Sequence, residues 1–140
     1  GNVGRGLVKG FGLRKGAVAT SVGHDSHNLT VIGVSGPDML AAINAVRDMG
    51  GGIAVVDGER VVAEVALPLA GLMSLKPLNA LYPEIEGVKA AIRELGCNLK
   101  SPFMTLSLLS LAVIPEIRIT DRGLVDSVNF TFIPLVESEG

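Results

Sequence analysis

The two histidines of this chain, His24 and His27, lie in one short polar stretch, GHDSHN (residues 23–28). Apolar runs on either side, GAVATSV and LTVIGV, are typical of buried strands. Imidazole and carboxylate groups can bind a metal or move protons, and a serine beside a histidine can act as a nucleophile. The same polar residue types also form turns, because their side chains bond nearby backbone amides. The stretch is therefore a candidate metal site, a candidate catalytic cluster or a polar turn.

The spacing of the two histidines does not favour a self-contained metal site. Side chains alternate between the faces of a continuous strand, so positions 24 and 27 would point to opposite sides. A catalytic zinc site needs roughly three protein ligands and a structural one roughly four. Cys97 is the only cysteine, so carboxylates such as Asp25 or Glu64 would have to complete the set.

A hydrolytic triad is not favoured either. Ser21 and Ser26 lie close to the histidines in sequence, but no strand–turn–helix elbow surrounds them. Two interpretations of GHDSHN stay open from the residues alone. The stretch is a structural polar turn, or it is a polar cluster that faces an active site on a neighbouring domain.

Composition narrows the class of protein. The chain has 140 residues, about one domain, with 48% hydrophobic and 19% charged residues and a mean hydropathy of +0.48. So apolar a composition predicts that part of the surface is covered by another domain or by a second subunit, as in a homo-oligomer. Because the first residue is Gly1 and no signal peptide is visible, we expect a piece of a longer protein or a chain whose tag was removed.

Charge and residue usage exclude several partners. The net charge is −2 without a basic cluster, and four Phe, one Tyr and no Trp leave little for base stacking, so no nucleic-acid partner is expected. No apolar run reaches about 18 residues, so no membrane span is expected. The single cysteine cannot form an internal disulfide and fits a reducing cytoplasm.

The order of predicted elements indicates an α+β fold. Residues 1–16 form a glycine-rich linker or edge segment, and residues 17–140 form a single α+β domain. Strands clustered in hairpins predict a mostly antiparallel or mixed β-sheet packed by two to three helices. The predicted elements are strands at 17–22 and 29–34, a helix from Pro37 to Gly50, a hairpin turning at Asp57-Gly58, a helix at 84–95, a short helix or strand from Ser101, a hairpin at 116–126 and a last strand from Asn129. Pro83 is expected to kink or separate a helical turn at 76–81 from the helix that follows.

Three longer stretches resemble the carboxy-terminal domain of adenine deaminases, which belong to the amidohydrolase superfamily. They are GFGLRKGAVATSVGHDSHNLTVIGVS, DMLAAINAVRDMGGGIAVVDGERVVAEVALPLAGLMS and PFMTLSLLSLAVIPEIRITDRGLVD. Together they cover roughly residues 10–126. The sequence departs from the family pattern at 75–83, where LKPLNALYPE has two prolines in place of an uninterrupted charged helix.

The resemblance implies hydrolytic deamination of adenine to hypoxanthine and ammonia. It places the reaction in a (β/α)8 barrel with manganese or iron, which turns bound water into a nucleophile. This chain has no H-x-H pair and no such barrel, so no metal ligand is assigned to it and the chain alone is expected to be inactive.

The resemblance also implies a role for the domain itself. The domain would pack on the N-terminal barrel in the cytoplasm, and its polar stretch would cover or line the mouth of the adenine site. Asp25 and His27 are the first candidates for that role, and His24 and Asn28 the next. The alternative function is a free-standing, non-catalytic purine-binding or assembly module.

Overall fold

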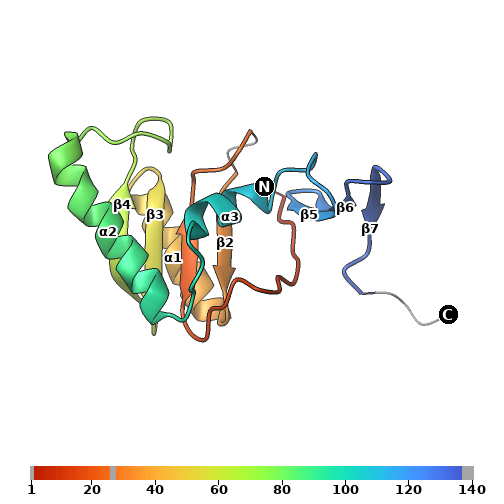
Figure 1. Ribbon diagram of the computed structural model, residues 1–140, viewed down its shortest axis with the longest axis horizontal. Coiled ribbons are helices and arrows are strands. Elements are labelled where there is room, and N and C mark those ends of the chain that lie inside the picture. The colour runs from red at the N-terminus through yellow and green to blue at the C-terminus, as the bar shows by residue number, and fades with distance from the viewer. Residues whose placement is uncertain (1, 26–27, 137–140) are drawn as a thin grey trace.

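The predicted α+β class is confirmed by a computed structural model that describes residues 2–25 and 28–136 (Figure 1). Its strands form two antiparallel sheets instead of one, and three helices accompany them. In chain order the elements are β1 (Ala17–Thr20), β2 (Thr30–Gly33), α1 (Gly36–Asp48), β3 (Gly52–Asp57), β4 (Arg60–Ala66), α2 (Leu78–Glu94), α3 (Pro102–Leu108), β5 (Ile117–Thr120), β6 (Gly123–Asp126) and β7 (Thr131–Ile133).

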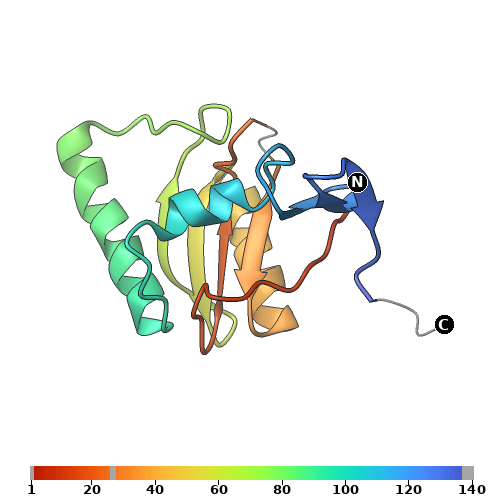
Figure 2. The same ribbon diagram turned by 45° about the vertical axis from the view of Figure 1, so that its right-hand side comes forward.

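The larger sheet, with strand order β2-β1-β3-β4, is covered on both faces. Alternate residues of β1 and β3 point to opposite sides, as strand geometry requires. One face, including Ala19 and Ala54, packs against α1, and the other, including Val18 and Val55, packs against α2 and α3. Figures 1 and 2 show α1 behind the sheet and the other two helices in front. The central strands are therefore buried on both sides.

The helix α1 begins and ends as its sequence predicts. The Ser35 side chain accepts a hydrogen bond from the Asp38 amide, Pro37 occupies the first turn, and Gly50 adopts a φ of 76° after the helix. Its buried face is centred on Ala42 and Val46. Alanines on both the helix and the strands allow a close approach of their backbones.

The turn between β3 and β4 lies one residue later than predicted. Asp57 pairs with Arg60 in the ladder, so the two turn residues are Gly58 and Glu59 and not Asp57-Gly58. Both have a positive φ, 60° and 62°, which is the signature of a type I′ turn. The Asp38 carboxylate accepts a hydrogen bond from the Glu59 amide at 2.7 Å, and this contact stabilises a glutamate in a conformation that favours glycine.

Pro83 is predicted to kink or separate two helical segments, and the separation is wrong. The helix α2 runs through it from Leu78 to Glu94. Pro83 lies near the helix start and is exposed, as is Asn79, whose carbonyl would otherwise accept the missing amide hydrogen bond. Water can satisfy that carbonyl, so the helix loses one internal bond and continues.

The chain from Ser101 forms a helix, α3, and Leu106 anchors it in the core. The predicted hairpin and last strand then form the smaller sheet, with order β5-β6-β7. Asp126 closes the β6–β7 turn by accepting hydrogen bonds from the amides of Val128 and Asn129 and from the Asn129 side chain. These bonds, those from Asn129 first, hold the pKa of the Asp126 carboxyl below its usual value.

Residues 2–16 contain no helix or strand, yet they contribute to the core. Phe11 is 4% exposed and packs with the residues between the larger sheet and α2. Cys97, just beyond α2, is buried in the same core. The division of the chain at residues 16 and 17 stays a prediction. Over the described residues, none of the helices has the length and apolar character needed to cross a bilayer.

The contact between Asp38 and the Glu59 amide can be tested by substitution. Asp38→Ala should lower the free energy of unfolding by roughly 1–3 kcal/mol, because it leaves a partly buried amide without a partner and removes a carboxylate from a helix N-terminus. Chemical denaturation measures this change. Asp48→Ala is the control, because Asp48 is exposed and its ion pair with Arg47 should contribute less than about 1 kcal/mol. Equal losses in the two variants would contradict the assignment.

Candidate functional site

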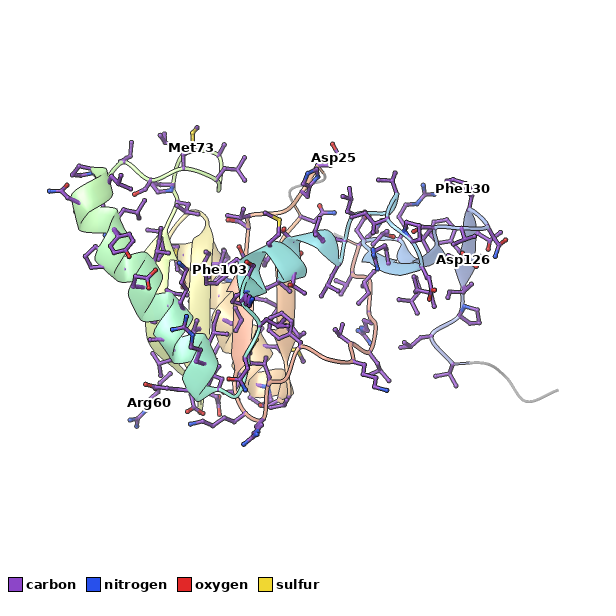
Figure 3. All side chains as sticks on the ribbon, viewed as in Figure 1. Asp25, Arg60, Met73, Phe103, Asp126 and Phe130 are labelled. Atoms are coloured by element: carbon purple, nitrogen blue, oxygen red, sulfur yellow. The ribbon has the colours of Figure 1, made fainter. Side chains whose placement is uncertain are left out.

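The polar stretch GHDSHN lies at one end of the strands of the larger sheet. We call this end of the sheet the loop edge. Three connections meet there: residues 21–29 between β1 and β2, residues 49–51 before β3, and residues 67–77 after β4. Figure 3 shows Asp25 and Met73 at this edge, with Arg60 at the opposite end of the sheet. The loop edge therefore collects segments that are far apart in sequence.

The hydroxyl of Ser21 forms hydrogen bonds to two of the other segments at the loop edge. Its Oγ accepts a hydrogen bond from the Gly52 amide at 2.8 Å and donates one to the Gly71 carbonyl at 2.7 Å. The Ser21 amide also donates to the Gly52 carbonyl at 3.0 Å. One side chain at the end of β1 thus positions both the start of β3 and the connection after β4.

Two glycines allow the close packing around Ser21. A Cβ at Gly51, whose φ is 118°, would lie 2.5 Å from the Cα of Gly71. Gly71 has a φ of 72°, and a Cβ there would lie 3.1 Å from the Ser21 hydroxyl. Only glycine avoids both the strain and the clash at position 51. The stretch LPLAGLMS therefore has a structural role at the loop edge, which the sequence reasoning did not assign.

The predicted site residues that the structure describes are presented to solvent. The side chains of His24, Asp25 and Asn28 are exposed, and Asp25 adopts a φ of 70°. The His24 amide forms a long hydrogen bond, 3.5 Å, to the Ser107 carbonyl at the end of α3. The residue His27 lies outside the described residues. The described part of the stretch is thus a polar connection between two strands, docked against α3 at one point.

The loop edge does not contain a recognisable metal site in the part of the chain that the structure describes. No three His, Cys, Asp or Glu side chains come together within residues 2–25 and 28–136. Cys97 is 1% exposed in the core, while the imidazole of His24 is at the surface. The described residues therefore do not fit a set of ligands for a catalytic metal.

Exposed apolar side chains also lie in the connections at the loop edge. They belong to the connection after β4 and to the residue that precedes β2: Leu29, Leu69, Met73 and Leu75. Exposed apolar side chains that gather in one region are typical of a surface that meets a ligand or another domain. The sequence reasoning did not predict this exposure, whose signal is the density of leucine and methionine in residues 67–75.

Comparison with known proteins decides the family. The family model described as the adenine deaminase C-terminal domain matches residues 1–131. The chain belongs to this family. The resemblance stated from the sequence is thereby confirmed.

Full-length relatives agree with this assignment. An adenine deaminase of Desulfatibacillum aliphaticivorans is 50% identical over 137 residues, which are 98% of this chain and 24% of that protein. One of Dehalococcoides mccartyi is 49% identical and one of Clostridium botulinum 48% identical, covering 96% and 99% of this chain. The chain spans about a quarter of the length of these relatives, 24%, 24% and 23%.

The bridging role of Ser21 gives a prediction. Ser21→Ala should lower the free energy of unfolding by roughly 1–3 kcal/mol, because the Gly52 amide and the Gly71 carbonyl lose their partner. Amide hydrogen exchange at Gly52 should also become faster. Ser74→Ala is the control, since Ser74 only accepts a hydrogen bond from the nearby Lys76 amide. If Ser21→Ala were no more destabilising than Ser74→Ala, the hydroxyl would not hold the loop edge.

Proposed function

We propose that this chain is the C-terminal domain of an adenine deaminase, an enzyme that hydrolyses adenine to hypoxanthine and ammonia. The match to the C-terminal domain family over residues 1–131 carries this proposal. Relatives named adenine deaminase are about four times as long, so the greater part of such an enzyme lies outside this chain. In the reaction, water adds to C6 of the purine, and the bond from C6 to the amino nitrogen breaks to release ammonia.

The proposal assigns the metal chemistry to the preceding domain, a barrel that binds manganese or iron. A divalent metal there would supply a water nucleophile at neutral pH. The described residues of this chain hold no fitting cluster of ligands, so they take no part in that step. The proposed setting is the cytoplasm, which the single, buried Cys97 fits, and the proposed assembly is a homo-oligomer.

For this domain, the proposed role is to complete the mouth of the adenine site with the polar stretch at the loop edge. Asp25 and His24 are exposed on a connection whose start is fixed by Ser21, so they can reach a neighbouring domain without unfolding the sheet. A carboxylate can accept a hydrogen bond from a purine N–H, and an imidazole can donate one to a ring nitrogen. His27 and Asn28 complete the set of candidates.

Two competing interpretations can be separated from this one. In the first, GHDSHN is a polar turn with a structural role only. In the second, the chain is a free-standing purine-binding or assembly module, which the match to a terminal part of much longer enzymes does not favour. Enzyme kinetics, thermal stability and purine binding distinguish all three interpretations.

Substitution in the full-length enzyme tests the role of the loop. Asp25→Ala and His27→Ala should each lower kcat/KM for adenine by about tenfold to a hundredfold, as expected for groups that position substrate or water. The melting temperature should not change. Glu59→Ala is a matched control, because Glu59 is also exposed, acidic and at positive φ, but lies in the β3–β4 turn at the opposite end of the sheet. A loss of thermal stability with intact kinetics would instead identify a structural turn.

The isolated chain tests whether catalysis belongs to another domain. We expect no adenine turnover by residues 1–140 with added Mn²⁺ or Fe²⁺, because the described residues contain no ligand cluster. An ammonia-release assay measures this directly. Calorimetry with adenine and hypoxanthine should detect no tight binding. Turnover would refute the assignment of catalysis to another domain, and tight purine binding would favour the free-standing module.

A further inference from the structure

The smaller sheet, β5-β6-β7, exposes apolar side chains on both of its faces. No helix packs broadly against its strands within the described residues. The strand register places Ile117 on one face and Phe132 on the other. Phe130 and Leu7 are 82% and 94% exposed, and several other apolar side chains on or beside the sheet are more than half exposed: Ile117, Val128 and Phe132. Figure 3 shows Phe130 at the far end of the molecule from α2. An apolar surface of this kind marks an interaction site.

The strands of this sheet are too short to be self-sufficient. They contain four, four and three residues, and such small sheets need an apolar face packed against another layer. Within the described chain, β7 pairs only with β6, so its outer edge has free backbone groups. The sheet therefore has both a face and an edge available for another segment.

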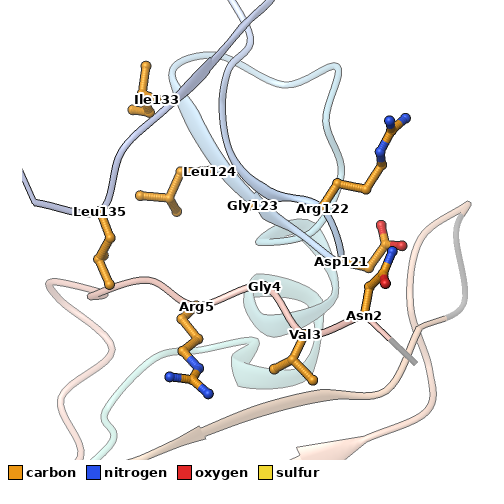
Figure 4. Close-up of a pocket in the computed structure, with 10 residues that line it drawn as sticks. All are labelled: Asn2, Val3, Gly4, Arg5, Asp121, Arg122, Gly123, Leu124, Ile133 and Leu135. Carbon is orange, nitrogen blue, oxygen red and sulfur yellow. The ribbon is translucent and has the colours of Figure 1, made fainter.

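Two hollows separate the sheet from the first residues of the chain. One, of about 330 Å³, is lined mainly by aliphatic side chains, including Leu7, Leu109, Ile117 and Leu124. The other, of about 540 Å³, lies between residues 2–5 and the β5–β6 turn with its neighbours (Figure 4). The first hollow is an apolar groove that side chains from another domain could fill.

Polar groups in the same region are also incompletely satisfied. Three buried side-chain atoms have no hydrogen-bond partner among the described residues: Ser110 Oγ, Arg118 Nε and Ser127 Oγ. Ser110 lies in the connection that leads to β5, Arg118 on β5, and Ser127 just after β6. Buried polar atoms in folded proteins are nearly always paired, by protein or by ordered water, so these three atoms mark the least satisfied hydrogen bonding of the described chain.

The path of residues 2–5 indicates which segment covers the sheet. They run against the β5–β6 turn so closely that a Cβ on Gly4 would lie 1.6 Å from the Thr120 carbonyl oxygen. The matched family is a C-terminal domain and the relatives are about four times as long, so in such a protein the preceding polypeptide would enter the domain at its first residues. We propose that the face of β5-β6-β7 that carries Ile117, Ile119 and Leu124, with its apolar groove, is the docking surface for the domain that precedes residue 1 in the full-length enzyme. This inference rests on the proposed function, because it requires the longer protein.

Cysteine labelling of the full-length enzyme tests the docking surface. Ile117→Cys and Leu135→Cys, both in the lining of the groove, should react with a small maleimide about tenfold or more slowly than in urea, because the interface must open first. Val62→Cys and Leu40→Cys are matched controls. Their native residues are 52% and 59% exposed, against 51% and 50% for Ile117 and Leu135. Mass spectrometry of the individual peptides separates each site from other cysteines.

Each outcome of this experiment decides the proposal. Protection at 117 and 135 that persists on dilution supports docking of the preceding domain. Labelling rates within a few-fold of those in urea would overturn the proposal. Protection that disappears on dilution would also overturn it, because a second copy of the enzyme would then be covering the sheet. Should the variants not fold, hydroxyl-radical footprinting of the unmodified enzyme at Ile117 and Leu135, with Leu40 as reference, gives the same comparison. Adenine turnover is measured separately, so an inactive enzyme with a covered sheet would refute the proposed function and not the docking.

Discussion

The burial of β1 and β3 on both faces is the constraint on which the rest of the molecule depends. Residues 17–20 and 52–56 lie between α1 on one side and α2 with α3 on the other. Strands enclosed in this way have no free face on which to bind a ligand or a partner. Binding surfaces are therefore left to the ends of these strands, to the edge strands and to elements outside the three layers. The loop edge lies at the ends of the strands, and the smaller sheet lies outside the layers.

The parts of the fold that depend on local chemistry could be predicted from the sequence. Ser35, Pro37 and Gly50 define the helix α1 through capping and backbone geometry, which involve only neighbouring residues. The turn residue Glu59 could not be predicted, because its positive φ depends on a hydrogen bond to Asp38, 21 residues earlier. The effect of Pro83 could not be predicted for a similar reason. The free-energy cost of a proline inside a helix depends on whether the carbonyl that it leaves unpaired is exposed to water, and tertiary structure determines that exposure.

In the candidate site, too, local features could be predicted from the sequence and long-range contacts could not. The residue types and spacing of GHDSHN were sufficient to identify an unusual polar connection between two strands. The anchor of that connection, Ser21, could not be identified, because its partners Gly52 and Gly71 follow 31 and 50 residues later. Nor could the separation of the strands into two sheets be predicted, since hydrophobic periodicity indicates which residues form strands and not which strands pair.

The loop edge and the smaller sheet are connected through the end of α3. The Ser107 carbonyl accepts the hydrogen bond from the His24 amide, and two residues later the Leu109 carbonyl accepts one from the Ile119 amide of β5 at 3.0 Å. Just before these two residues, Leu106 fixes α3 in the core with no exposed surface. If a domain docks on the smaller sheet as proposed, its position relative to the polar stretch would depend on α3. Because a side chain at the mouth of an active site must be placed to within a fraction of an ångström, the proposed docking and the proposed role of the polar stretch would both require α3 to keep its position in the core.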